Sequence, residues 1–355
     1  MTTAGTSGTS TSARYPFRLA KPLSAAVVGA TGYTGSEVCR LLAGHPTVEV
    51  TVATSERQDG ESLSSACPWL TSNLKLTSFD ASSIEADVIF LCQSNGFAMN
   101  VAPELAHRMK VIDLSADFRL ADTDLYPQWY GFEHACPDLD PWPVYGLPEL
   151  VPHEEIAGAS IIANPGCYVT TALLALVPLK RAGLIEGVPV IDAKSGVSGA
   201  GRSRQETEYL LSELHGAMKP YKTTGHRHTP EIEQLFGGEV WFTPHLLPIS
   251  RGICATIHLQ ANAGLKVEHL YDCWNKSYSG SKFVRTQVDP PSTKQVFGSN
   301  SCVLFADIDD RTGHVVLVSV TDNLVKGAAG QAIQNMNIML NLPEETGLPI
   351  EGVWP

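Results

Sequence analysis

The first half of the chain alternates short apolar runs with amphipathic segments. Apolar runs suited to strands cover residues 23–28, 48–54, 86–92 and 111–114, and residues 36–42 carry apolar positions at helical spacing. Strands that alternate with helices are typical of an open, mostly parallel sheet. The pattern therefore predicts an α/β fold that begins with a Rossmann-type nucleotide-binding domain.

The second half of the chain has a different pattern. Four further apolar runs predict strands of a second, largely antiparallel sheet, at residues 188–193, 241–252, 254–260 and 314–321. An apolar stripe over 324–340 predicts a helix that opens with Asn323 and packs back onto the nucleotide-binding domain. We expect the second part to be an α+β domain with a mainly antiparallel sheet.

These patterns divide the chain into three parts. Residues 1–22 are rich in Ser, Thr, Gly and Ala and contain no acidic residue, so we expect a flexible tail. Residues 23–165, together with the C-terminal helix and chain end over 324–355, are assigned to the first domain. Residues 166–323 are assigned to the second domain.

Composition limits the class of protein and its partners. Hydrophobic residues make up 43% of the 355 residues and charged residues 17%, which permits a large core and argues against global disorder. The net charge of −12 argues against nucleic acid as a partner. No apolar run is long enough to span a membrane, so no membrane association is expected.

The cysteines bear on the compartment. All eight are scattered without a C-x-x-C pair, so neither a zinc site nor a disulfide framework is predicted, and a cytoplasmic, reducing compartment fits best. Arg14 and Arg18 in the Ser- and Thr-rich start also resemble an organellar transit peptide. An organelle is therefore the alternative location.

A glycine-rich turn joins the first strand to the first helix. Residues 29–35 read Gly-Ala-Thr-Gly-Tyr-Thr-Gly. Glycines let the backbone approach a pyrophosphate, which the helix N-terminus then holds. Strand, turn and helix in this order predict a dinucleotide site rather than a bare tight connection. The candidate contacts are Gly29, Thr31, Gly32, Tyr33, Thr34 and Gly35.

The end of the second strand bears on the choice of cofactor. NAD-specific folds tend to place Asp or Glu there to bind the ribose 2′-hydroxyl. Here the strand is followed by Ser55 and Arg57, whose hydroxyl and guanidinium groups suit a 2′-phosphate. NADP is therefore favoured, although Glu56 lies between them. Ser94, after the strand over 86–92, is a further cofactor candidate unless it only caps a helix.

Cys167 follows a Pro-Gly turn and opens an apolar segment with helical spacing. This places its sulfur near a helix N-terminus, where backbone N–H groups and the helix dipole favour a thiolate. A thiolate is a strong nucleophile at neutral pH. The alternative is a buried structural cysteine, which is the commoner role of a free Cys.

Two later segments carry polar side chains suited to an active site. The loop over 195–202 is rich in Ser and Gly and ends in Arg202, which suits an anion, although a flexible loop would look the same. His226 and His228 flank an arginine and precede a helix start at Thr229. Without a third ligand at useful spacing, we expect general acid–base chemistry and no metal site.

Taken together, these motifs resemble the N-acetyl-gamma-glutamyl-phosphate reductase family, an arginine-biosynthesis branch of the semialdehyde dehydrogenases. The resemblance covers nearly all of the chain beyond the tail. The Pro-Gly-Cys-Tyr and His-Arg-His-Thr-Pro-Glu-Ile-Glu-Gln motifs are specific to this branch, whereas the glycine turn is not. The matching segments are 29–35, 113–119, 164–171, 195–202, 225–234, 243–252 and 322–327.

The resemblance implies reduction of a small-molecule acyl phosphate with NADPH and release of inorganic phosphate. Cys167 is expected to attack the acyl phosphate, and hydride from NADPH then reduces the resulting thioester to the semialdehyde. A histidine is expected to activate the thiol and to manage the proton on the hemithioacetal. The family pattern gives that role to His226, with His228 the weaker candidate.

The resemblance also implies contacts to both ligands. Asn323 is expected to face the nicotinamide, and Ser195 and Gly196 to lie on the cofactor side. Arg119 and Arg202 are expected to hold phosphate or carboxylate groups. The full set of expected substrate contacts is Arg119, Asn164, Ser198, Arg202, Glu233 and Arg251.

Two other functions stay open. Aspartate-semialdehyde dehydrogenase runs the same chemistry on a shorter acyl phosphate, but we expect that relative to carry an arginine-then-histidine motif where residues 248–252 read Pro-Ile-Ser-Arg-Gly. An NADP-binding regulatory protein with a dead site is the other, and the intact Cys167 and His226 argue against it. The resemblance further implies that residues 23–165 and 324–355 form the NADP-binding domain and 166–323 the catalytic and dimerisation domain. It also suggests a homo-oligomer, either a dimer or a tetramer.

Overall fold

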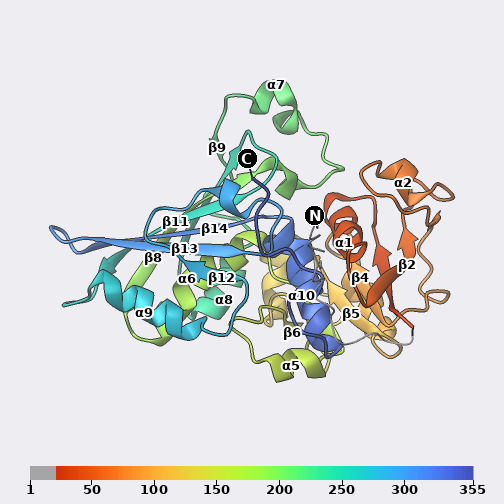
Figure 1. Cartoon of the computed structure of the whole chain (residues 1–355), viewed down its shortest axis with the longest axis horizontal. Coiled ribbons are helices and arrows are strands. Elements are labelled where there is room, and N and C mark those ends of the chain that lie inside the picture. Colours follow the sequence, from red (N-terminus) through yellow and green to blue (C-terminus); the bar gives the residue numbers. More distant parts are fainter. Residues whose placement is uncertain (1–20, 355) are drawn as a thin grey trace, which may run out of the picture.

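The computed structural model describes residues 21–354, so the tail expected over 1–22 lies outside the described residues except for its last two positions. Two seven-stranded sheets form two lobes that lie side by side (Figure 1). Within the described part of the chain, no helix is both long and apolar enough to cross a membrane.

The first sheet is parallel throughout, as the alternating pattern predicted, and its strand order is β3-β2-β1-β4-β5-β7-β6. The order reverses beside β1, and in open α/β sheets a ligand cleft forms at such a point, outside the carboxyl ends of the strands. The strands are β1 Leu23–Val28, β2 Val48–Thr54, β3 Leu76–Thr77, β4 Val88–Leu91, β5 Lys110–Asp113, β6 Val144–Tyr145 and β7 Ile161–Ala163.

Helix α1 begins at Tyr33, inside the glycine-rich segment 29–35, and packs on the first sheet through its apolar positions, which include Val38 and Leu41. Gly29 has a φ of 80°, a backbone conformation that favours glycine. Gly35 packs against the carbonyl oxygen of Gly29, which leaves no space for a Cβ at position 35. The helices of this lobe are α1 Tyr33–Leu42, α2 Leu63–Ala66, α3 Ala98–Leu105, α4 Tyr126–Tyr130 and α5 His153–Gly158, with a 3₁₀ turn η1 at Thr123–Leu125.

The second sheet has the order β12-β13-β14-β11-β8-β10-β9. Only the β8–β10 and β12–β13 pairs are parallel, so the mainly antiparallel sheet that the sequence predicted is confirmed. The strands are β8 Ile185–Gly196, β9 Lys219–Pro220, β10 Trp241–Leu247, β11 Ile253–Ala261, β12 Val284–Thr286, β13 Cys302–Asp309 and β14 His314–Thr321.

Two strand predictions in this lobe need correction. The strand expected over 241–252 ends at Leu247, and residues 248–252 form a turn because Pro248 has no N–H to donate and Gly252 has a φ of 107°. Strand β13 had no counterpart among the predicted strands, although it pairs with a neighbour on each side, β12 and β14.

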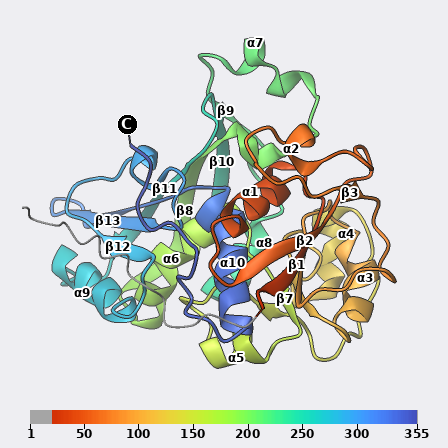
Figure 2. The same cartoon turned by 45° about the vertical axis from the view of Figure 1, so that its right-hand side comes forward.

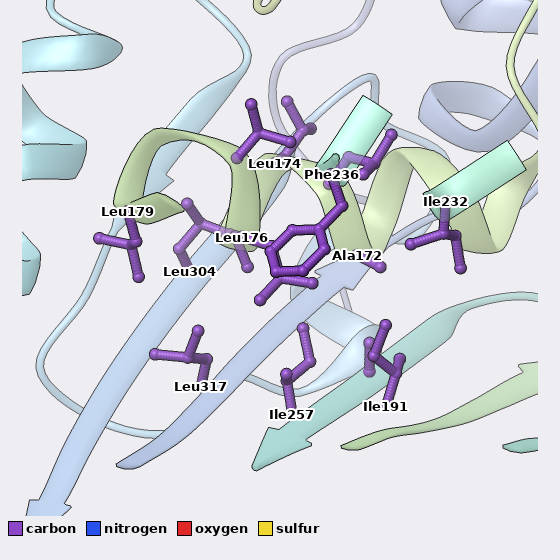
Figure 3. Close-up of a cluster of buried hydrophobic side chains, with 14 of the residues drawn as sticks. Ala172, Leu174, Leu176, Leu179, Ile191, Ile232, Phe236, Ile257, Leu304 and Leu317 are labelled. Carbon is purple, nitrogen blue, oxygen red and sulfur yellow. The ribbon is translucent and has the colours of Figure 1, made fainter. Parts of the chain in front are cut away.

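Helix α6 (Cys167–Arg181) is the centre of the larger core. Its side chains from Tyr168 to Leu179 are buried on all sides between the second sheet and helices α8 and α9. Figure 3 shows Leu174 and Leu176 of this helix above Ile257 and Leu317 of the sheet, with Phe236 of α8 between them. The other helices are α7 Leu211–Leu214, α8 Thr229–Phe236 and α9 Val267–Ser277, with 3₁₀ turns η2 Val197–Ala200, η3 Thr207–Tyr209 and η4 Thr293–Val296.

The C-terminal helix lies between the two lobes (Figures 1 and 2), whereas α7 stands on a loop that projects from the molecule. The helix expected from residue 324 begins with a π-helical segment, η5 (Val325–Ala329), and continues as α10 (Gly330–Met339). The residues after Met339 are turns and coil, since Pro343 cannot continue a helix. Asp322, rather than Asn323, caps this helix by accepting from the backbone N–H groups of Leu324 and Val325.

Candidate active site

A cleft of about 1280 Å³ runs along the carboxyl ends of the first sheet and is closed on its far side by segments of the second lobe. The structure brings most of the predicted site residues together in its wall. Those that line it are Gly29, Thr31, Gly32, Tyr33, Thr34, Ser55, Arg57, Ser94, Arg119, Asn164, Cys167, Ser198, Arg202, His228 and Asn323.

Six predicted site residues lie outside the wall of the cleft, namely Gly35, Ser195, Gly196, His226, Glu233 and Arg251. Gly35 is used for close packing inside the turn, and Gly196 packs against the backbone of Ser250. Glu233 accepts a hydrogen bond from the backbone N–H of Val240 and so closes the end of α8. Arg251 is paired with Glu37 and Asp322 behind the cleft.

The cofactor half of the cleft is built on the N-terminus of α1. Gly32 is the N-cap, and no side chain among residues 21–354 caps the helix there, so its first N–H groups face the cleft. Arg202 donates to the carbonyl oxygen of Thr31 at 2.9 Å, which brings the Ser- and Gly-rich loop of the second lobe against this turn. Backbone donors at a helix N-terminus are the donor set that a pyrophosphate needs.

The ribose end of this half fits a 2′-phosphate. The carboxylate of Glu56 accepts a hydrogen bond from the backbone N–H of Phe79 at 2.9 Å, so one of its oxygens is already engaged by the protein. Ser55 lies in the cleft wall and shares a hydrogen bond of 3.0 Å with Thr31, and the exposed Arg57 stands beside it. A hydroxyl and a cation at this point suit the 2′-phosphate of NADP, although Glu56 also lines the cleft.

Cys167 is the first residue of α6, as the sequence predicted, and its partly buried side chain lines the catalytic end of the cleft. Burial raises the pKa of its thiol to about 11, and the positive charge of Arg119 and the backbone N–H of Tyr168 lower it only in part. The helix N-terminus favours a thiolate, as predicted, but loss of solvent opposes it more strongly. The thiol needs a base to give up its proton.

A buried cluster around Glu231 holds the turn that precedes Cys167. One carboxylate oxygen of Glu231 accepts from the backbone N–H of Gly166 at 2.8 Å and from the hydroxyl of Tyr145 at 2.7 Å. Its second oxygen lies 3.6 Å from Nη1 of Arg119, whose Nε donates to the carbonyl oxygen of Asn164 at 2.8 Å. The cluster thus fixes residues on both sides of Pro165.

The two histidines occupy different places. His228 lines the cleft, and a Cβ on Gly166 would lie 2.5 Å from its Nε2, so this ring rests against the turn before Cys167. His226 lies behind it, with ring centroids 4.8 Å apart, and its Nδ1 accepts from the backbone N–H of His228. No hydrogen bond joins either ring to the Cys167 sulfur within residues 21–354.

Both histidines are kept neutral by their surroundings. Burial lowers the pKa of His226 to about 3, with the positive charges of Arg227 and Lys222 acting in the same direction. Burial likewise lowers the pKa of His228 well below its ordinary value, and His226 and Arg119 add to the effect. A neutral imidazole can accept a proton, and an anionic ligand near Arg119 and Arg227 would raise its basicity by offsetting their charge.

The segment η5 closes the cleft behind the cysteine. A Cβ on Gly327 would lie 2.8 Å from the Cβ of Cys167, so only glycine lets the two backbones come this close. Asn323, just before this segment, accepts from the backbone N–H of Gly252 and donates to the hydroxyl of Ser198, which holds it at the cleft wall.

Two residues of the site were missed as candidates from the sequence. Glu231 is the third residue of α8, and its spacing of three from His228 places both side chains at the same end of the helix. That spacing was a usable signal, and it distinguishes Glu231 from Glu233. Arg227, between the two histidines, also lines the cleft, although no role was predicted for it.

The raised pKa of Cys167 predicts how its reactivity depends on pH. Below a pKa of about 11 the thiolate fraction rises with pH. The rate of alkylation of Cys167 by iodoacetamide in the free enzyme should therefore increase about tenfold per unit between about pH 7 and 10. Peptide mass spectrometry separates Cys167 from the other cysteines, with the Cys167→Ser variant as blank. A plateau beginning near neutral pH would contradict the prediction.

The contact between Gly327 and Cys167 predicts the effect of a single methyl group. Gly327→Ala should displace the cysteine and slow turnover by about tenfold to a hundredfold, because reacting groups tolerate little misplacement. Gly280→Ala is the matched control, since a Cβ there meets nothing within 4 Å. Steady-state rates and thermal unfolding of both variants are compared with the parent. Equal rates in the two variants would disprove the packing argument.

Two sequence families match the chain. "Semialdehyde dehydrogenase, NAD binding domain" matches residues 24–159, and "Semialdehyde dehydrogenase, dimerisation domain" matches residues 167–323. Among solved structures, aspartate semialdehyde dehydrogenase II from Vibrio cholerae, complexed with ASA, aligns with a TM-score of 0.68 at 20% identity, over 91% of this chain and 99% of that chain. Aspartate semialdehyde dehydrogenase with NADP from Candida albicans aligns with a TM-score of 0.63 at 16% identity, over 90% and 99%. At these identities the likeness establishes the fold.

Curated relatives are closer in sequence. N-acetyl-gamma-glutamyl-phosphate reductase from Symbiobacterium thermophilum is 47% identical over 93% of this chain and 98% of its own length. The enzyme of the same name from Thermus thermophilus is 43% identical over 93% and 99%. The "probable N-acetyl-gamma-glutamyl-phosphate reductase, chloroplastic" of Arabidopsis thaliana is 43% identical over 94% and 86%. With a two-lobed semialdehyde-dehydrogenase fold, a cleft that fits NADP and this degree of identity, the chain belongs to the N-acetyl-gamma-glutamyl-phosphate reductase family.

Proposed function

We propose that this chain reduces N-acetyl-gamma-glutamyl phosphate to N-acetylglutamate semialdehyde and inorganic phosphate with NADPH, a step of arginine biosynthesis. One observation carries the proposal. A single cleft holds a dinucleotide turn at one end and, at the other, a cysteine on a helix N-terminus beside a neutral histidine and two arginines. A nucleotide site that ends on such a cysteine is suited to reducing an acyl group held as a thioester.

The first half of the reaction transfers the acyl group to the enzyme. The thiol of Cys167 loses its proton to the base, and its sulfur attacks the carbonyl carbon of the acyl phosphate. The bond from that carbon to the phosphate oxygen breaks, inorganic phosphate leaves, and a thioester remains on Cys167. Arg119 and Arg227 line the cleft around this point and suit the phosphate, whose charge also offsets the positive field on the histidines.

In the second half the thioester carbon accepts a hydride, which NADPH supplies when bound. The oxygen that becomes negative lies near the N-terminus of α6, where backbone N–H groups favour negative charge. The protonated base returns its proton to this oxygen to give the hemithioacetal. Collapse of the hemithioacetal breaks the carbon–sulfur bond, frees the semialdehyde and restores the thiol.

We assign the base to His228 rather than to His226, which the family pattern favoured. His228 lines the cleft and rests against Gly166, whereas His226 lies behind it and hydrogen-bonds to the backbone of His228. Glu231 is a positioning residue in this scheme because it binds the N–H of Gly166 and pairs with Arg119. His226 supports the loop that carries His228.

The aspartate-semialdehyde dehydrogenase alternative is less well supported. The solved structures of that name share the fold at 20% identity or less in the two examples above, while relatives at 43–47% identity carry the reductase name. A regulatory protein with a dead site is also disfavoured, because Cys167, His228 and Arg119 all line one cleft with the dinucleotide turn.

Three further proposals concern organisation. We propose that residues 23–165 and 324–355 form the NADP-binding domain and 166–323 the catalytic domain, since each range centres on one of the two sheets. The chain is a homo-oligomer, dimer or tetramer, that pairs through the face of the second sheet opposite α6, where Val190 is 37% and Trp241 65% exposed. The compartment is the cytoplasm, with an organelle as the alternative, since the Arabidopsis relative is named chloroplastic.

Reverse-direction kinetics tests the proposed reaction. With N-acetylglutamate semialdehyde, sustained NADPH formation should require both NADP and phosphate, because phosphate releases the acyl group from Cys167. NAD and aspartate semialdehyde serve as comparison substrates. Cys167→Ser should lose nearly all turnover and still bind NADPH. Sustained turnover without phosphate, or normal turnover in Cys167→Ser, would refute the acyl-enzyme route.

The assignment of the base is tested by a matched pair of variants. His228→Asn should lower kcat by about a hundredfold or more, the usual range for loss of a general base. His226→Asn should lower it less, because that ring acts through its neighbour's backbone. Thermal unfolding of each variant checks that the fold persists. A larger loss in His226→Asn would return the role to His226.

A further inference from the structure

Arg251 was expected to touch substrate, yet it lies behind the cleft wall at the meeting point of three segments. Its guanidinium donates to both carboxylate oxygens of Glu37 on α1, from Nη1 to Oε1 at 2.9 Å and from Nη2 to Oε2 at 2.8 Å. Nη1 also lies 3.6 Å from Asp322. The forked guanidinium group of Arg251 therefore joins the second lobe to α1, the helix at the cofactor half of the cleft, and to Asp322.

The carboxylates of this contact are buried. The side chain of Glu37 is 4% exposed and that of Asp322 is fully buried, while Arg251 is 21% exposed. Burial alone would raise the pKa of Glu37, but hydrogen bonds from Arg251 and Arg40 hold it below its ordinary value. Burial raises the pKa of Asp322, and Arg251 is the largest opposing influence. Removing Arg251 leaves buried negative charge without its main partner.

Each end of the contact leads to one reacting group. Glu37 is in the second turn of α1, whose N-terminus faces the cofactor half of the cleft. Asp322 caps the segment that carries Gly327, and Gly327 packs against Cys167. Gly252, next to Arg251, donates its N–H to Asn323 at 2.7 Å. Through these steps the position of Arg251 bears on both the bound nicotinamide and the sulfur.

We propose that Arg251 is a positioning residue that sets the alignment between the bound cofactor and the acyl group on Cys167. This inference rests on the proposed function. The planar guanidinium of Arg251 matches the geometry of a carboxylate. Its two N–H donors fix both the distance between Arg251 and Glu37 and the orientation of α1, whereas the single charge of a lysine would not fix the orientation. Loss of Arg251 should therefore impair hydride transfer and leave the intrinsic reactivity of Cys167 unchanged.

The test separates hydride transfer from thiol chemistry. A single turnover is run with N-acetylglutamate semialdehyde and NADP in the absence of phosphate. The hemithioacetal carbon gives up a hydride, its oxygen gives up a proton, and the thioester accumulates on Cys167. The absorbance of the NADPH formed reports the rate of hydride transfer. In Arg251→Met this rate should fall about tenfold or more. With semialdehyde deuterated at the aldehyde carbon, the isotope effect on steady turnover should increase as hydride transfer becomes limiting.

Alkylation of Cys167 in the free enzyme is the second readout. Its rate in Arg251→Met should stay within about twofold of the parent, because Glu231 and Arg119 hold the turn before Cys167 without Arg251. Arg251→Lys keeps the charge without the fork and should recover only part of the hydride-transfer rate. Arg311→Met is the matched control, since that side chain is 85% exposed on a surface turn.

A double-mutant cycle completes the test. Glu37→Gln should slow hydride transfer in the same way, and Glu37→Gln with Arg251→Met should be no slower than the worse single variant. Additive losses, unchanged hydride transfer, or parallel losses in alkylation and hydride transfer would each overturn the proposal. If Arg251→Met does not fold, Arg251→Lys carries the comparison. Absence of a single turnover in the parent enzyme would instead count against the proposed function.

Discussion

The buried carboxylate of Glu231 is the contact on which the catalytic end of the cleft depends. It accepts the N–H of Gly166 and the hydroxyl of Tyr145 and lies beside Arg119. A carboxylate fully removed from water is costly unless donors surround it, and here the donors come from both lobes. The helix that carries Cys167 is therefore fixed at its first residue by contacts to segments distant in sequence. This geometry also explains why Arg119 and Asn164 meet at one point.

The electrostatics of the site follow from the same burial. The helix dipole and Arg119 favour a thiolate at Cys167, but loss of solvent opposes it more strongly, so the thiol keeps its proton in the free enzyme. The same loss of solvent keeps His226 and His228 neutral. Burial thus favours the neutral form of both the thiol and the imidazoles, and the positive charge of Arg119 and Arg227 lowers the pKa of Cys167 and of His228 alike.

Much of this could be predicted from the sequence, because the signals are local. The glycine turn, the start of α6 at Cys167 and the start of α8 at Thr229 follow from adjacent residues, and the structure confirms these helix starts. The missed features depend on contacts across the fold. The partners of Glu231, which include Tyr145 and Arg119, are distant in sequence. Arg251 could likewise be placed behind the cleft only once its distant partners on α1 and at Asp322 were known.

The exposure of Arg57 has a consequence for how this enzyme can evolve. Arg57 lies at the rim of the cleft on a solvent-exposed loop, whereas Glu231 and Asn164 at the other end are almost completely buried. Substitutions at an exposed rim usually cost little folding free energy, and substitutions in a buried polar cluster cost much more. Coenzyme preference is therefore open to change by a few mutations, while the chemistry of the acyl group is constrained by the stability of the fold itself.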